Sequence, residues 1–208
     1  RVEGALNMSG AEAAENKRAI EELKKAIYEN SREAVIERVA YIWFNRLSAL
    51  RFMDANAYSL VRTVSPVGDE KQPEILVQAN MGIIHDDLDI DRQKVIDLIT
   101  GVLPSSDGQS EAYRLLLVAV CNYYYDAMPF MFEKIDDYSE LLLPLDLLSD
   151  DSIVSATVSA MDAEACEEVE VIGWLYQFYI SEKKDEVFAS KKKVSADNIP
   201  AATQLFTP

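Results

Sequence analysis

The sequence has 208 residues, enough for one domain or one and a half, and 49% of them are hydrophobic, so the chain can bury a core. Its formal net charge of −16 excludes general DNA binding by the chain as a whole, because affinity for phosphates comes from cations that release counterions. No apolar run approaches the ~20 residues that a transmembrane helix needs, so we expect no contact with a membrane.

Apolar residues at helical spacing dominate the chain and predict a mainly α-helical, irregular multi-helix domain. We expect a first helix over residues 11–29 and a second over 31–55, with Asn30 as its N-cap and Glu33 completing a capping box. The second helix carries two apolar stripes, which predicts burial against more than one neighbour. The stripes consist of Val35, Val39, Ile42, Arg46 and Ala49, and of Ile36, Trp43, Leu47 and Leu50.

The middle of the chain departs from this pattern once. Residues 57–68 predict a short strand or an extended loop, with a two-stranded β element near 57–78 as the alternative to an all-helical fold. Further helices are expected over residues 73–79, 89–100, 110–127 and 151–160, and short helical turns over 130–148.

A last long helix is expected over residues 163–188. Its first turns are rich in glutamate and its end carries lysines, an order that complements the helix dipole. Apolar and aromatic side chains cover two adjoining faces between these ends. We therefore expect protein to surround this helix almost completely.

The two cysteines and the aromatic clusters have structural interpretations. Cys121 and Cys166 are typical of a reducing cytoplasm, in which each is a small buried hydrophobe. Aromatic residues such as Trp43, beside Arg46 and Arg51, have the composition of a base-stacking surface, but their spacing favours a helix–helix core.

No metal site or catalytic group is predicted from the residue counts. His85 is the single histidine, so histidine-rich zinc sites are excluded, and no third group marks a Cys–His pair. An aspartate-rich stretch imitates the start of a calcium loop, but Arg92 and Leu98 stand where glycine and a bidentate glutamate are required. Its residues Asp87, Asp89 and Asp91 are better explained as the acidic start of a helix.

Four blocks of sequence carry a resemblance to a known family. They are Tyr41–Met53 (YIWFNRLSALRFM) with Tyr58, Ala127–Glu133 (AMPFMFE) with Leu141–Pro144 (LLLP), Val169–Lys184, and Ile199–Pro208. In this order they resemble the amino-terminal part of the large DNA adenine methyltransferases of phage-exclusion systems, the PglX family of BREX. Residues 1–30 and 59–112 carry little of the resemblance.

The resemblance implies a role as part of a larger enzyme. The chain begins at Arg1 without a methionine and ends on Thr207 and Pro208, so we interpret it as an excised piece. Residues 1–189 would be the amino-terminal helical domain of an S-adenosylmethionine-dependent DNA N6-adenine methyltransferase. Residues 190–208 would be the linker and the truncated start of the catalytic domain.

The resemblance also implies partners and a compartment. The parent enzyme would methylate double-stranded DNA in the cytoplasm and mark host DNA as self, in a defence similar to restriction-modification. The chain alone would be inactive and would bind no S-adenosylmethionine. It would pack against the downstream methyltransferase domain, and its further expected roles are to assist DNA binding or to contact other phage-defence components.

The candidate site residues lie near the carboxyl end. By resemblance, Phe206, Thr207 and Pro208 match a Phe-Thr-Pro that forms part of the wall of the S-adenosylmethionine site. A threonine hydroxyl and a helix-start amide suit the cofactor's carboxylate, because helix amino-termini favour anions. The family's glycine-containing cofactor loop and its Asn-Pro-Pro-Tyr adenine clamp are absent from the sequence. Without them the chain cannot hold the extruded base.

A short lysine stretch precedes those residues. It contains Lys183, Lys184, Lys191, Lys192 and Lys193. The stretch is typical of a solvated linker, and the alternative is contact with DNA phosphates in the assembled enzyme.

A self-standing acidic module is the alternative to the methyltransferase interpretation. Such a module would mimic DNA or dock a basic partner. A mimic needs carboxylates along one exposed face, whereas these carboxylates concentrate at predicted helix starts and alternate with lysine. That distribution favours the methyltransferase interpretation.

Overall fold

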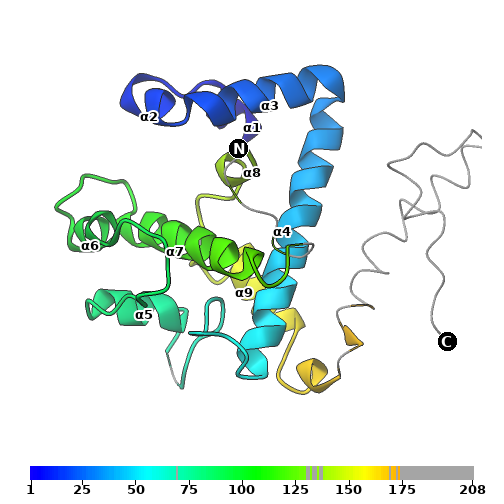
Figure 1. The fold of residues 1–208 in the computed structure, drawn as a ribbon, viewed down its shortest axis with the longest axis vertical. Helices are drawn as coiled ribbons and strands as arrows, with labels where there is room; N and C mark the ends of the chain where they lie inside the picture. Colours follow the sequence, from blue (N-terminus) through cyan, green and yellow to red (C-terminus); the bar gives the residue numbers. More distant parts are fainter. Residues whose placement is uncertain are drawn as a thin grey trace, which may run out of the picture. The chain divides into compact units, whose positions relative to one another are not determined.

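The computed structural model describes residues 1–68, 70–129, 132, 135, 138–168, 170, 171 and 173, without the side chains of residues 11 and 12. The chain divides into two units, Arg1–Asp162 and Ala163–Pro208. The first unit is built from helices (Figure 1), which confirms the predicted fold class. No helix in the described part of the chain has the length and apolarity needed to cross a bilayer.

The first unit begins with three short helices and one long one, and Figure 1 shows their arrangement. They are α1 (Val2–Leu6), α2 (Gly10–Glu15), α3 (Lys17–Glu29) and α4 (Arg32–Ala55). The helix predicted over residues 11–29 is thus divided at Asn16, whose ψ of 15° leaves the helical range. Helix α3 packs against α1, α2 and α4. Its buried residues Ile20 and Leu23 supply the apolar face of this contact.

The amino-terminal cap of α4 differs from the prediction by one residue. Ser31 has an extended backbone, and its hydroxyl accepts a hydrogen bond from the Ala34 amide at 3.1 Å. Asn30 instead ends α3, where its side-chain amide donates to the Ala26 carbonyl at 3.0 Å. Because Ser31 is the N-cap, Glu33 is the second residue of the helix. A capping box requires a glutamate or glutamine as the third residue, so the predicted capping box is wrong.

Helix α4 is buried along much of its length, as its two apolar stripes predict. Its buried residues are Val35, Val39, Trp43, Arg46, Leu47, Ser48, Ala49, Leu50, Met53 and Asp54. The helix packs against α3 and α9 (Ile153–Ala160), two elements far apart in sequence. Ile36 is the exception within its stripe, because 45% of its surface stays exposed.

Three helices pack together in the second half of this unit. They are α5 (Glu74–Asn80), α6 (Arg92–Thr100) and α7 (Gly108–Tyr125), and each contacts the other two. Gly108 permits a close approach of α6 and α7, because a Cβ at this position would overlap the backbone carbonyl of Leu98. A short helix, α8 (Tyr138–Leu141), packs against α3.

The predicted β element near residues 57–78 is wrong for the described residues of that range, which form a loop followed by α5. The reason is chemical. The amides of Thr63, Val64 and Ser65 donate to the side chain of Asp54, so they are not available for a strand ladder.

The second unit is described over 163–168 and at residues 170, 171 and 173. The helix predicted from residue 163 does not begin there, because Ala165–Glu167 form a 3₁₀ turn in which Cys166 is buried. In an α-helix Glu164 and Glu168 would lie one turn apart, and like charges at this spacing are unfavourable. The rest of the predicted helix, from residue 174, lies outside the described residues.

Candidate functional site

The candidate site residues named from the sequence lie beyond the described part of the chain. This holds for Phe206, Thr207 and Pro208, and for Lys183, Lys184, Lys191, Lys192 and Lys193. Their roles therefore stay predictions. The described residues offer two other features around α4, a buried polar cluster and an apolar groove.

The buried polar cluster forms around Asp54, which is 1% exposed near the end of α4. Its carboxylate accepts hydrogen bonds from the Ser59 hydroxyl (2.5 Å) and from the amides of Thr63 (3.1 Å), Val64 (2.9 Å) and Ser65 (3.0 Å). Burial raises the pKa of Asp54, and these hydrogen bonds oppose the increase. The carboxylate thus fixes the loop over residues 59–65.

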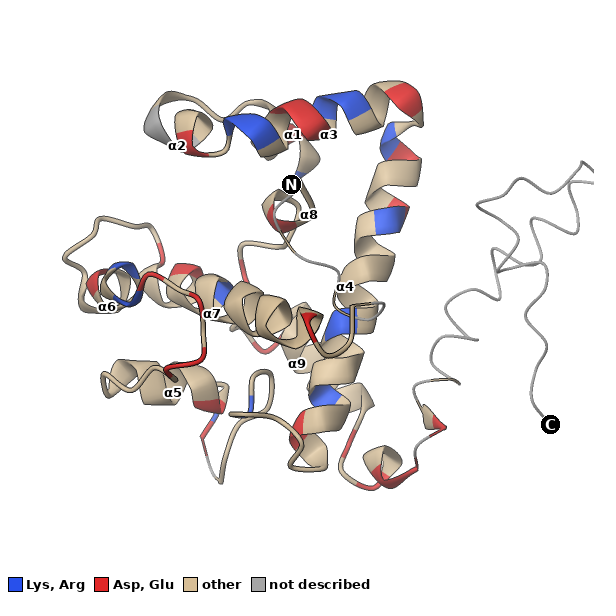
Figure 2. Cartoon of the chain, viewed as in Figure 1, with Lys and Arg blue, Asp and Glu red and all other residues tan. Residues whose placement is uncertain are grey.

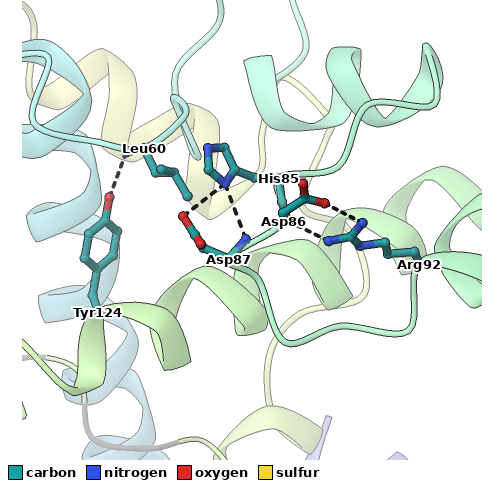
Figure 3. Close-up of polar contacts among 6 residues, drawn as sticks. All are labelled: Leu60, His85, Asp86, Asp87, Arg92 and Tyr124. Atoms are coloured by element: carbon teal, nitrogen blue, oxygen red, sulfur yellow. Dashed lines mark hydrogen bonds and ion pairs between the residues drawn. The ribbon is translucent and has the colours of Figure 1, made fainter.

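Two tyrosines of α7 hold the same loop from another helix. The Tyr113 hydroxyl donates to the Thr63 carbonyl at 3.0 Å. The Tyr124 hydroxyl accepts from the Leu60 amide at 2.9 Å (Figure 3). Burial raises the pKa of both phenols, that of Tyr113 well above its ordinary value. Both therefore stay neutral at physiological pH and serve as hydrogen-bonding groups rather than as general bases.

Arg51 extends the cluster to the end of the first unit. Its guanidinium donates to the Met161 carbonyl at 2.6 Å and to the Ser65 hydroxyl at 2.9 Å. Arg51 and Asp54 lie about one turn apart on α4. This one turn of helix therefore orders both the loop and the segment after α9.

Trp43 of α4 belongs to the core, as its spacing predicts, whereas Tyr41, Phe44 and Phe52 are half-buried. Trp43 is 4% exposed, and its indole N–H donates to the Ser139 carbonyl at 2.9 Å. The guanidinium of Arg46, itself buried, lies 5.1 Å from the centre of the Trp43 ring. Buried rings cannot stack on bases, so this pair is not a nucleic-acid surface.

The aspartate-rich stretch before α6 serves as a helix start. The Asp91 carboxylate accepts from the Lys94 amide at 3.0 Å and caps α6. Beside it, the imidazole of His85 lies 3.5 Å from the Asp87 carboxylate, and Arg92 pairs with Asp86 at 2.7 Å (Figure 3). No group of three or more metal-ligating side chains forms among the residues that the structure describes.

The apolar groove lies between α4 and α9 and encloses about 520 Å³. We call it the α4/α9 groove. Its lining residues are Ile36, Val39, Ala40, Trp43, Phe44 and Leu47 of α4, Ile153, Ala156 and Thr157 of α9, and Arg1, Val2, Arg32, Leu142 and Pro144. The charged residues among the described lining are Arg1 and Arg32.

The α4/α9 groove was not predicted from the sequence. The signal was present, since Ile36 and Ala40 are one turn apart on α4 and Ile153 and Ala156 are three residues apart on α9. The pairing of these two helices across the chain could not be read from either pattern alone.

Comparison with known proteins gives similarity over nearly the whole chain. No established family model matches it. The chain is 42% identical over 195 residues to the adenine-specific methyltransferase BrxX of Escherichia coli O9:H4 (strain HS), covering 90% of the chain and 15% of that protein. It is 40% identical over 182 residues to the adenine-specific methyltransferase PglX of Lacticaseibacillus casei (strain Zhang), covering 84% of the chain and 15% of that protein.

Proposed function

The chain belongs to the PglX family of adenine-specific methyltransferases, and on that premise we propose that it is the non-catalytic, amino-terminal helical domain of a longer DNA N6-adenine methyltransferase of a BREX phage-defence system. In this proposal residues 1–189 form the helical domain and 190–208 lead into the catalytic domain. The parent enzyme transfers a methyl group from S-adenosylmethionine to adenine in double-stranded DNA.

One observation carries the proposal. The similarity covers 90% of this chain but 15% of the BrxX relative, so the chain corresponds to a small part of that methyltransferase. The chemistry of the described residues supports a structural role. The polar groups of the Asp54 cluster are engaged in holding a loop, and the groove is lined by apolar side chains.

The proposal is tested first on the whole parent protein. We expect the parent to produce N6-methyladenine in DNA when supplied with S-adenosylmethionine, as measured by mass spectrometry of digested DNA. Residues 1–208 alone should neither methylate DNA nor bind the cofactor in calorimetry. Absence of N6-methyladenine from the parent, or turnover by the 208-residue chain, would overturn the proposal.

The proposal also assigns a contact with S-adenosylmethionine to the last three residues of the chain. We place Phe206, Thr207 and Pro208 in the wall of the S-adenosylmethionine site of the parent, with the Thr207 hydroxyl close to the cofactor's carboxylate. Thr207→Ala in the parent should raise the KM for S-adenosylmethionine by about tenfold, the effect of losing ~1.4 kcal/mol of binding. Thr203→Ala, four residues earlier, is the matched control and should leave the KM unchanged. Equal effects of the two changes would exclude this role.

The lysine stretch is proposed to contact DNA phosphates in the assembled parent. Each phosphate contact contributes ~0.9 to the slope of log affinity against log salt concentration. Changing Lys183, Lys184, Lys191, Lys192 and Lys193 together to glutamine should therefore flatten that slope. The control changes Lys17, Lys24 and Lys25 of α3 to glutamine. An unchanged slope in the five-lysine variant would remove the idea.

The distribution of charge supports this function over an acidic DNA mimic. Acidic and basic residues alternate along α3 (Figure 2). There Arg18 pairs with Glu22 at 2.9 Å and Lys25 with Glu29 at 3.8 Å. Carboxylates neutralised in this way do not form the continuous anionic face that a mimic needs. Tight, salt-sensitive binding of the chain to a basic DNA-binding protein would favour the mimic instead.

A further inference from the structure

We infer that the α4/α9 groove is the docking site for an apolar helix from the methyltransferase domain of the same polypeptide. The inference rests on the proposed function, because it requires that the parent contain that domain. It assigns a surface and a partner chemistry to the packing between the two domains.

The groove is an open apolar surface on the first unit. Val39, Trp43 and Leu47 are buried at its base. Ile36 on α4 and Ile153 on α9 remain 45% and 37% exposed. Contiguous apolar surface that remains open to water is typical of an interaction site.

The dimensions of the groove suit a helix. It is bounded by two packed helices, and the groove between such helices accepts a third whose apolar side chains recur every three or four residues. From Ile36 to Leu47 the α4 wall includes 12 residues and spans ~17 Å at the helical rise. A partner helix of about three turns would cover this length and insert two or three bulky side chains.

The charges at the groove define the orientation of the partner. Arg1 and Arg32 are its charged described lining residues, and Arg32 already pairs with Glu3 at 3.2 Å. A partner helix that places a glutamate, an aspartate or its carboxyl end near these arginines gains a favourable interaction. DNA is a poor occupant, because apolar side chains make up most of the lining and Arg32, one of its two arginines, already pairs with Glu3.

The remaining length of the relatives supplies such a partner. The similarity covers 15% of each relative, so most of each of those polypeptides lies outside the matched region. A helix of the same polypeptide is present at high effective concentration, which favours its docking over that of a separate protein.

The test uses the whole parent protein. A photoreactive p-benzoylphenylalanine replaces Ile36 in one variant and Ile153 in another, and mass spectrometry identifies the crosslinked peptides. We expect both positions to crosslink to one segment of the methyltransferase domain. Met81, which is 70% exposed and does not line the groove, is the control position and should not crosslink to that segment.

Other outcomes would overturn the inference. Crosslinks from both positions to a second copy of the protein, to residues 174–208, or to nothing would each exclude the proposed occupant. Ile36→Glu in the parent gives an independent measurement, since it should increase the rate at which protease releases the amino-terminal domain by at least tenfold. The control Met81→Glu, at an exposed position, should not increase this rate. An unchanged circular dichroism spectrum would show that both variants are folded.

These results separate the inference from the proposed function. If the parent forms N6-methyladenine but the groove does not crosslink to the methyltransferase domain, the docking inference fails and the proposed function stands. If the parent forms no N6-methyladenine, the proposed function fails whatever the crosslinks show.

Discussion

The carboxylate of Asp54 accepts a hydrogen bond at 2.9 Å from the backbone amide of Val64, ten residues further along the chain. Both residues are buried, so the carboxylate takes the place that a neighbouring strand would have in a sheet. The order of this loop therefore depends on a side chain of α4.

Removal of that carboxylate should destabilise the protein strongly. Asp54→Ala leaves the amides of Thr63, Val64 and Ser65 without their acceptor, and each unsatisfied buried group costs ~1–3 kcal/mol. We expect the free energy of unfolding in urea to fall by ~3 kcal/mol or more. Ser59→Ala removes one hydrogen bond to the same carboxylate and should cost ~1 kcal/mol. Similar losses in the two variants would contradict the role assigned to Asp54.

Gly108 should be intolerant of the smallest side chain. Glycine to alanine within a helix ordinarily stabilises it, by ~1 kcal/mol on the propensity scale. At Gly108 the added Cβ would overlap the Leu98 carbonyl, a backbone atom that cannot rotate away. We expect Gly108→Ala to lower the free energy of unfolding by ~1–3 kcal/mol, as overpacking does.

The matched control for this prediction is Gly4→Ala in α1, where the added Cβ meets no atom within 4 Å. Thermal unfolding of both variants measures the difference, and Gly4→Ala should be neutral or slightly more stable than the wild type. A stabilised Gly108→Ala protein would mean that α6 and α7 can move apart at no cost.

The cap of α7 should make stability depend on pH in the acid range. The hydrogen bond from Ser110 lowers the pKa of Asp107 below its ordinary value of 3.8. A lowered carboxylate pKa gives stability that is present above the unfolded-state pKa and is lost as pH falls through the folded-state pKa. Asp107→Ala should cost ~0.5–2 kcal/mol at pH 7, and this difference from the wild type should shrink below pH ~4. Asp107→Asn, which still caps, should show little pH dependence of its own. A constant difference across this range would exclude the mechanism.

The ion pair between α2 and α6 should make a small contribution to the stability of the protein. The pH dependence of this contribution should be opposite in sign to that of the α7 cap. Lys94 donates to Glu15 at 2.9 Å, and this hydrogen bond raises the lysine pKa. A raised lysine pKa gives stability that is present below the unfolded-state pKa and is lost as pH rises through the folded-state pKa. Lys94→Met should lower the free energy of unfolding by ~0.2–1 kcal/mol, less in 1 M salt. A loss that does not change with salt would indicate packing by the lysine stem instead.

Helix positions were predictable from the sequence because their determinants are local. Asp91 caps α6 and Gly101 ends it with a left-handed backbone, both within a few residues of the apolar pattern that they enclose. The same holds for Ser152 at the start of α9. Such signals place helix ends within a few residues without knowledge of the neighbours.

The loop over residues 59–65 and the α4/α9 groove were not predictable from the sequence, because their determinants are distant in the chain. Residues 57–68 contain β-branched residues typical of a strand, but the acceptor for their amides is Asp54, which belongs to the preceding helix. The α4/α9 groove requires two segments about 110 residues apart to pack, as the bond from Arg51 to Met161 illustrates. The periodicity of each segment shows that its helix has an apolar face, but it does not show which other segment that face packs against.

The two tyrosine contacts to the loop affect how the protein unfolds locally. The backbone groups of Leu60 and Thr63 are tied to Tyr124 and Tyr113 of α7, and the adjoining amides to Asp54 of α4. Hydrogen exchange at these amides requires the loop to separate from both helices together. A segment with neither helix nor strand should therefore exchange as slowly as the centre of α7, whereas the short α1 should exchange early.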